Sequence, residues 1–364
     1  MQISTTPTTS PVSDERLAEI LAQPGFGIHF TEHMFITEWT PDRGWYDARI
    51  TPYAPLTLDP ATAVLHYAQE IFEGMKAYRH EDDSVWIFRP EANAQRMLRS
   101  SARLALPEIP EEDFVAAVDA LVTADQRWVP DNVGEKSLYV RPFMIATEAF
   151  LGVRPAKHVT FMVIASPAGA YFSKGIKPIT LWLTTEYTRA GRGGMGAAKT
   201  GGNYASSLVA QQEATAHGCD QVVFLDAQEG RYVEELGGMN MYFVLADGRI
   251  ITPATGTILE GITRASVIEL AGKLGHQVEE RRFSIDEWRD GVASGEIAEV
   301  FACGTAAVVT PVGSLKWATG SEQVISSTPD VADAGPVTLQ IRQALVDIQY
   351  GRADDTFGWL HRVC

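Results

Sequence analysis

Residues 191–204 read Gly-Arg-Gly-Gly-Met-Gly-Ala-Ala-Lys-Thr-Gly-Gly-Asn-Tyr, so a single lysine, Lys199, lies between two glycine-rich runs. Glycine lets the backbone approach a ligand closely and adopt positive φ. A lysine presented in this way, followed closely by Tyr204, is a candidate for forming a Schiff base with a carbonyl compound. Most lysines in loops are solvent-exposed, however, and the segment by itself favours that ordinary interpretation.

The glycines at 191–196 could instead form a phosphate-binding loop. A dinucleotide site requires a strand, a glycine turn and a helix within a βαβ unit, and a P-loop requires the pattern GxxxxGK[ST]. This segment leads to a lysine and a second glycine pair, and it matches neither pattern. A non-enzymatic anion- or nucleotide-binding protein is therefore the weaker alternative.

Composition excludes several other classes of protein. The length of 364 residues predicts about two domains. The formal net charge of −16 disfavours nucleic acid and anionic membranes as partners. The cysteines, Cys219, Cys303 and Cys364, have no metal-ligand spacing and no disulfide pattern. With no apolar run of about 18 residues and no signal-peptide pattern, we expect a cytoplasmic protein without a bound metal.

The first half of the chain has an α+β pattern. Residues 1–12 are rich in Ser, Thr and Pro and are expected to form a disordered leader, and residues 13–168 are expected to form an N-terminal domain. Within it, Ser13 predicts the cap of a helix ending at Ala22, and Asp59-Pro60 predicts the start of a helix continuing to about Phe72. Strands and separate helices follow one another without βαβ alternation.

A linker is predicted at residues 169–178, where Pro, Gly and Ser concentrate, and a C-terminal domain at 179–364. In this domain we expect a helix over 203–217 and a capping box at Ser284–Glu287. One apolar strand is expected over 299–310, interrupted at Gly304-Thr305, where a glycine often marks close approach of a ligand.

Three features besides Lys199 suit pyridoxal phosphate. A protein that uses this cofactor supplies a Schiff-base lysine, a partner for the pyridine nitrogen and donors for the phosphate. Glu234-Glu235 precede a glycine turn and an apolar strand, and residues 261–264 precede a helix, so their amides could bind an anion. Gly304-Thr305 adds the third feature.

With these motifs in place, the sequence resembles the branched-chain amino-acid aminotransferases of pyridoxal-phosphate fold type IV (class IV aminotransferases). The resemblance extends over nearly the whole chain. Its motifs lie at residues 72–77 (FEGMKA), 88–90 (FRP), 96–100 (RMLRS), 138–142 (LYVRP), 169–172 (GAYF), 199–204 (KTGGNY), 235–240 (ELGGMN) and 301–311.

The resemblance implies roles for individual residues. Lys199 would be the catalytic residue and would carry pyridoxal 5′-phosphate covalently. The other expected cofactor contacts are Tyr204 with the ring oxygen, Glu235 with the pyridine nitrogen, and Arg96, Ile262, Thr263 and Thr305 with the phosphate. The expected substrate contacts are Phe26, Tyr67, Tyr139, Arg141, Tyr171, Gly238 and Ala306, with Val153 supplied by a partner subunit. Relatives from animals have threonine where this chain has Gly238.

The fold implied by the resemblance is an α+β fold of two domains, with a smaller N-terminal domain, a barrel-like β core in the larger C-terminal domain and the cofactor at the domain interface. The implied activity is reversible transamination of L-leucine, L-isoleucine and L-valine with 2-oxoglutarate by a homodimer. A D-amino-acid aminotransferase and an aminodeoxychorismate lyase of the same fold are the alternatives nearest to this one.

Overall fold

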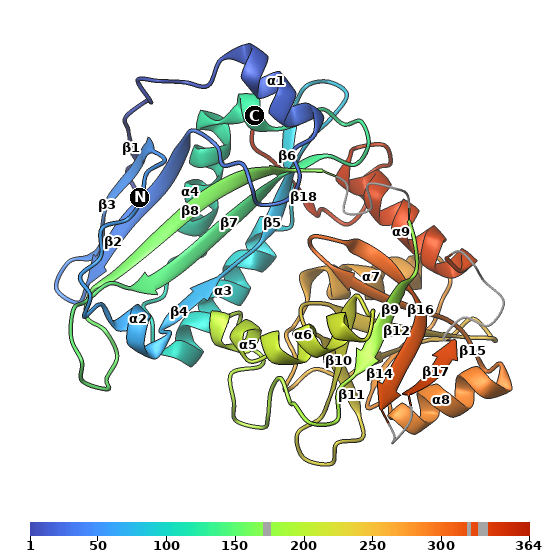
Figure 1. Cartoon of the computed structure of the whole chain (residues 1–364). Coiled ribbons are helices and arrows are strands. Elements are labelled where there is room, and N and C mark those ends of the chain that lie inside the picture. The colour runs from blue at the N-terminus through green and yellow to red at the C-terminus, as the bar shows by residue number, and fades with distance from the viewer. Residues whose placement is uncertain (170–175, 319–321, 327–333) are drawn as a thin grey trace. The chain divides into compact units, whose positions relative to one another are not determined.

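The computed structural model describes residues 1–169, 176–318, 322–326 and 334–364 (Figure 1). The chain divides into two compact units. The first comprises Met1–Tyr171, Ala198–Gly201 and Ile348–Cys364, and the second comprises Phe172–Ala197 and Gly202–Asp347. The predicted linker, 169–178, lies mostly outside the described residues. The predicted boundaries are wrong for the C-terminus, because a strand at Leu360–Arg362 pairs with Val85–Phe88 in the first unit.

One nine-stranded, mostly antiparallel sheet forms the first unit. Its strands in spatial order are β1 (Ser4–Thr5), β3 (Gly44–Pro52), β2 (His33–Thr40), β8 (Val159–Ala168), β7 (Ser137–Ala146), β5 (Met75–Arg79), β6 (Val85–Phe88) and β18 (Leu360–Arg362), with β4 (Glu70–Phe72) paired to β7. Its helices are α1 (Asp14–Ala22), α2 (Ala63–Tyr67), α3 (Pro90–Leu104), α4 (Glu111–Ala124) and the 3-10 helix η1 (Gln126–Trp128).

The core of this unit follows from alternation along the strands. Phe35 of β2 and Phe161 of β8 are fully buried, and their rings pack edge to face. Phe114 of α4 packs its ring against Phe161, and the i, i+4, i+7 series of α4 (Phe114, Val118, Leu121) is fully buried as well. The periodicity that predicts α4 therefore identifies its core-facing side.

Two expectations for the first unit are wrong. Ser4–Thr5 of the predicted leader pair in parallel with Arg49-Ile50 of β3. The predicted helix to Phe72 is only the short α2, because Asp59 starts a turn, with its Oδ1 accepting the Ala61 amide at 2.8 Å. Ile71 then pairs with Met144 in β7 and is completely buried, so sheet burial outweighs helix periodicity there.

The second unit is built on a barrel-like sheet. Its strands in spatial order are β11 (Val233–Leu236), β10 (Gln221–Leu225), β9 (Ile179–Leu183), β16 (Val308–Ala318), β15 (Ile297–Gly304), β12 (Asn240–Leu245), β13 (Ile250–Pro253) and β14 (Val278–Arg281), with β17 (Glu322–Ser326) paired to β16. Because β11 also pairs with β12, the first six strands form a closed ring. The predicted barrel-like core is confirmed.

Helices α5 (Gly201–Ala205), α6 (Leu208–Ala216), α7 (Ile262–Lys273), α8 (Ile285–Ser294) and α9 (Pro336–Gln349) complete the chain. The capping box at Ser284 and Glu287 is confirmed. The single helix predicted over 203–217 is divided into α5 and α6. The strand predicted over 299–310 is instead a hairpin of β15 and β16, with Gly304 opposite Val308. None of the helices in the described ranges is both long and apolar enough to cross a bilayer.

Candidate active site

Lys199 is held by its backbone from two sides within the first unit. Its amide donates to Ser100 Oγ of α3 at 3.0 Å, and its carbonyl accepts the Phe72 amide of β4 at 2.9 Å. The ammonium nitrogen lies 4.8 Å from the centroid of the Phe72 ring. A lysine side chain is flexible, so these backbone bonds fix where its chain starts.

The first unit also contains an apolar pocket, and among the described residues that line it Arg141 is the one cation. The pocket has a volume of about 280 Å³, and Phe26, Phe30, Tyr139, Arg141 and Ile164 contribute to its lining. Arg141 Nη2 donates to Tyr139 Oη at 3.0 Å, and the Phe26 ring meets the Tyr139 ring edge to face. The Arg141 guanidinium carbon also lies 4.6 Å from the Phe72 ring centroid.

Arg96 on α3 is buried and bidentate to a carboxylate that the sequence did not identify. Its Nε and Nη2 bond Glu73 Oε1 and Oε2 at 2.9 and 2.7 Å, and Asn93 Nδ2 donates to the same Oε2 at 2.7 Å. Glu73 belongs to the motif at 72–77, but spacing alone cannot show that it faces Arg96. Glu73 is fully buried, and it fixes the orientation of the guanidinium.

In the second unit, Glu235 of β11 forms a buried ion pair with Arg189, and both side chains are almost inaccessible (3% and 1% exposed). Glu235 Oε1 also accepts the Leu259 amide at 3.2 Å. The guanidinium carbon of Arg189 lies 6.0 Å from the Tyr204 ring centroid. Arg189 thus pairs with one ring-binding candidate of this unit and lies near the other, a role that no sequence pattern indicated.

The expected phosphate-binding amides lie at the N-terminus of α7. Gly261 is the N-cap with extended backbone and no side-chain cap, which leaves the first amides of the helix, at Ile262 and Thr263, without intrahelical acceptors. A Cβ on Gly261 would collide with Asn240 Oδ1, so only glycine fits there. Such a helix start suits an anion.

The turn between β15 and β16 carries Thr305 and Ala306. Val308, which follows them, has φ +61°, a left-handed conformation that is strained for a β-branched residue. Strain of this kind clusters at ligand sites. Gly238 lies beside Tyr204, since a Cβ there would contact the tyrosine ring at 3.7 Å.

Three expected substrate contacts, Tyr67, Val153 and Tyr171, are not among the described residues that line the apolar pocket. Tyr67 is 38% exposed, and its hydroxyl donates to the Leu151 carbonyl. Val153 on the same long loop is 90% exposed, and it is not among the described residues that line the apolar pocket. Tyr171 lies outside the described residues.

Gly191, Arg192 and Gly193 line a separate cavity of about 400 Å³ in the second unit, together with the segment 253–257 and Glu234. Glu234 Oε1 accepts the Thr257 hydroxyl, and burial raises the pKa of this carboxyl above its usual value. Its neighbour on β11, Glu235, points to the opposite face of the strand. The two adjacent glutamates therefore have separate environments.

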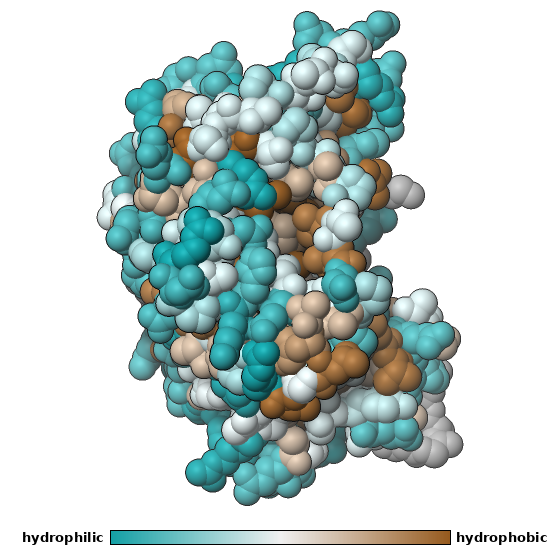
Figure 2. All heavy atoms as spheres, turned by 90° about the vertical axis from the view of Figure 1, so that its left-hand side faces the viewer, coloured by the Kyte–Doolittle hydropathy of each residue, from teal (hydrophilic) through white to brown (hydrophobic). Residues whose placement is uncertain are grey.

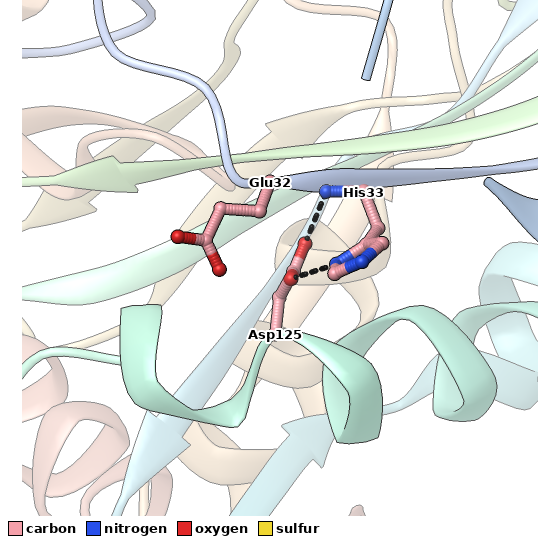
Figure 3. Close-up of side chains that lie close together, drawn as sticks. All are labelled: Glu32, His33 and Asp125. Carbon is pink, nitrogen blue, oxygen red and sulfur yellow. Dashed lines mark hydrogen bonds and ion pairs between the residues drawn. The ribbon is translucent and has the colours of Figure 1, made fainter. Parts of the chain in front are cut away.

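Figure 3 shows a third polar cluster, formed by Glu32, His33 and Asp125 in the first unit. Asp125 accepts from the His33 amide at 2.9 Å and lies 2.6 Å from Nδ1, while His33 Nε2 accepts the Thr8 amide at 3.0 Å. Glu32 accepts the Val12 amide at 2.6 Å. Both ring nitrogens of His33 are therefore already hydrogen-bonded. Through the bonds of the Thr8 and Val12 amides to His33 and Glu32, this cluster connects the N-terminal segment to the sheet.

Comparisons with known proteins agree on one family. A family model described as "Amino-transferase class IV" matches residues 70–315. A probable branched-chain-amino-acid aminotransferase of Streptomyces coelicolor is 57% identical over 98% of this chain and 97% of its own length. A branched-chain-amino-acid aminotransferase of Mycolicibacterium smegmatis is 51% identical over 100% of this chain and 98% of its own length.

Solved structures give the same result. The branched-chain amino acid aminotransferase of Escherichia coli superposes with a TM-score of 0.76 at 28% identity, covering 92% of this chain and 100% of that one. The branched-chain amino acid aminotransferase of Thermobaculum terrenum, solved in its PLP-form, gives a TM-score of 0.71 at 25% identity, covering 92% of this chain and 99% of that one.

Proposed function

Because the chain belongs to the class IV aminotransferases and, within them, to the branched-chain-amino-acid aminotransferase family, we propose that it transfers the amino group reversibly between L-leucine, L-isoleucine or L-valine and 2-oxoglutarate. The observation that carries the proposal is the apolar pocket whose Arg141 lies near the same Phe72 ring as Lys199. Its described lining is mainly apolar and aromatic, with Arg141 as the one guanidinium among those residues. A branched aliphatic side chain needs the apolar wall, and the distal carboxylate of glutamate needs the cation.

Class IV aminotransferases use pyridoxal 5′-phosphate, and the donor set of this chain fits it. The cofactor supplies an aldehyde that forms an imine with amines and a pyridine ring that accepts negative charge from the substrate carbon. We propose that Lys199 holds it covalently and that Glu235 pairs with the ring nitrogen and Tyr204 with the ring oxygen. The proposed phosphate ligands are Arg96, the amides of Ile262 and Thr263, and Thr305.

The chain's own groups then perform the proton transfer. With the cofactor bound, the amino group of Lys199 would take the proton from the substrate Cα and deliver it to the cofactor's aldehyde carbon, and in the second half-reaction it would move a proton in the opposite direction. Arg189 beside Glu235 favours the ionised carboxylate, because an adjacent positive charge stabilises the charged form. An ionised Glu235 in turn favours a protonated pyridine nitrogen.

One pocket must accept two kinds of side chain in turn. For leucine, the aromatic rings of Phe26 and Tyr139 supply apolar contact. For glutamate, Arg141 can bind the distal carboxylate bidentately, with Tyr139 Oη already at hydrogen-bond distance from its guanidinium. The proposed α-carboxylate ligands are the backbone groups of Thr305 and Ala306, and Gly238 and Tyr171 are proposed as further substrate contacts.

A homodimer is part of the proposal. Large apolar side chains are exposed on the first unit, including Phe26, Ile28, Leu65, Leu151 and Val153, and Figure 2 shows hydrophobic surface gathered in patches on one face of the molecule. Patches of this kind mark association surfaces. In the proposed dimer, Val153 enters the partner's pocket, which accounts for its 90% exposure in a single chain.

The test is spectroscopic. L-Leucine is added to the purified holoprotein and the absorbance of the bound cofactor is followed, with D-leucine as the matched control. We expect L-leucine alone to bleach the band and 2-oxoglutarate to restore it, with 4-methyl-2-oxopentanoate and glutamate as products. A response to D-leucine alone would indicate a D-amino-acid aminotransferase, and a protein that binds no cofactor would indicate an anion-binding protein.

A further inference from the structure

The segment that follows Lys199 is held by a side chain to which neither the sequence motifs nor the comparisons assign a role. Glu70, the first residue of β4, accepts the Gly201 amide through Oε1, and the same oxygen accepts the Thr200 hydroxyl at 3.2 Å. Two residues further along β4, the Phe72 amide donates to the Lys199 carbonyl. Residues 199–201 therefore lie along β4, with one bond to its backbone and two to its glutamate.

We propose that Glu70 is a positioning residue: it fixes the backbone of Thr200 and Gly201 and thereby the point from which the Lys199 side chain extends. The inference rests on the proposed function for the role of Lys199. Its effect on catalysis is geometric, since misplacing a reacting group by about 1 Å can cost on the order of 100-fold in rate.

Glycine at position 201 supports this assignment. A Cβ at Gly201 would lie 2.5 Å from Glu70 Oε1, 3.3 Å from its Cδ and 3.8 Å from its Oε2. All of the closest atoms that a methyl group would meet thus belong to Glu70. The backbone at Gly201 approaches the carboxylate so closely that any other residue would displace it.

The electrostatic surroundings suit a carboxylate acceptor. Burial raises the pKa of Glu70, and the Gly201 amide, the Thr200 hydroxyl and the charge of Arg141 each act in the opposite direction, because they stabilise the ionised form. An amide that donates to an ionised acceptor makes a stronger hydrogen bond than one that donates to a neutral oxygen.

Two substitutions separate hydrogen bonding from charge. Glu70→Ala removes the acceptor, while Glu70→Gln keeps an oxygen at the same place. In the apoprotein, hydrogen–deuterium exchange of the peptide that contains Gly201 should accelerate about tenfold in Glu70→Ala, which corresponds to a loss of about 1.4 kcal/mol in the free energy that protects this amide. In Glu70→Gln the exchange should accelerate less than about threefold. Glu19→Ala, which breaks an exposed ion pair with Arg16, is the matched control and should leave this exchange unchanged.

In the holoenzyme, Glu70→Ala should lower kcat at least tenfold while KM for 2-oxoglutarate changes less than threefold, because the lysine is displaced and the substrate pocket is not. Glu70→Gln should recover most of kcat. A merely structural role for Glu70 would lower thermal stability without this separation of kcat from KM.

A double-mutant cycle gives the sharpest test. Gly201→Ala should lower kcat severely in the natural background, where the methyl meets Glu70, and have little further effect when Glu70→Ala is already present. Equal losses in both backgrounds, or unchanged exchange and kcat in Glu70→Ala, would overturn the inference while leaving the proposed function intact. The proposed function fails separately, if Lys199→Ala still transaminates.

Discussion

At the scale of single residues, the site is organised by buried charge pairs that join distant positions in the chain. Glu73 orients Arg96, and Arg189 neutralises Glu235 across a sequence separation of 46 residues. In the second pair Arg189 lies outside the family motifs, and in the first both residues belong to motifs whose sequences do not show that the two side chains meet. Residue roles that depend on pairing therefore could not be predicted from the spacing of residues.

Arg141 should discriminate between the two substrate classes. We expect Arg141→Ala to raise KM for glutamate and 2-oxoglutarate about 10- to 100-fold, because a charge-assisted hydrogen bond contributes about 1.5–3 kcal/mol. The same substitution should change KM for leucine less than about threefold. Steady-state kinetics with both substrate pairs measure this. Arg43→Ala, which removes a guanidinium stacked on Tyr46, serves as the control. Equal losses for leucine and glutamate would refute the assignment.

Arg189 should matter through its charge. Arg189→Met leaves the Glu235 carboxylate buried without its cation, and breaking a buried pair in this way costs about 3–5 kcal/mol. We expect a matching loss in urea unfolding of the apoprotein and weaker binding of pyridoxal phosphate in a titration. Arg189→Lys should restore part of both. The double variant Arg189→Met/Glu235→Gln should lose less free energy of unfolding than the sum of the losses in the two single variants. Losses that add strictly would contradict the pairing.

At the scale of elements, helix N-caps could be predicted from neighbouring residues, but strand pairing between distant segments could not. Ser13 and Ser284 cap their helices as predicted, because an N-cap depends on adjacent residues alone. Ile71 and Phe72 look helical by periodicity, but they pair with β7, which lies far along the chain. The closing of the six-stranded ring by β11 and β12 is likewise a pairing that no single segment encodes.

Helix α9 is capped by a strand residue, which gives a prediction about stability. Glu299 of β15 is buried and accepts the amides of Val337 and Thr338 at 3.0 and 2.8 Å, at the first turn of the helix. Glu299→Ala removes this cap and should lower the free energy of unfolding by about 1–3 kcal/mol. Urea denaturation measures it, with the exposed Glu296→Ala as the control. A loss no larger than that of Glu296→Ala would show that the cap contributes nothing.

At the scale of the whole molecule, the C-terminal strand β18 belongs to the sheet of the first unit, and a histidine on it forms ion pairs with two helices of that unit. His361 of β18 lies 2.9 Å from Asp119 of α4 and 3.4 Å from Glu91 of α3. Hydrogen bonds to Asp119 and then to Glu91 raise the pKa of His361 to about 10, well above the usual value of 6.5.

This pairing predicts a pH dependence of stability. Since the folded-state pKa is raised, the stabilisation is fully present below about pH 6.5 and is lost as pH rises through about 10. The stability difference between the natural protein and His361→Phe should therefore shrink between pH 6 and pH 10.5 in urea titrations. A difference that stays constant over this range would show that the ion pairs do not stabilise the strand.

The division of the chain into units has a consequence for its synthesis. The first unit is assembled from three separate stretches, and its edge strand β18 follows the residues of the second unit in the chain. A ribosome has therefore made every residue of the second unit before the first can be completed. The N-terminal sheet cannot be completed before the second unit has been synthesised, and strand β6 keeps one edge unpaired until β18 has been made.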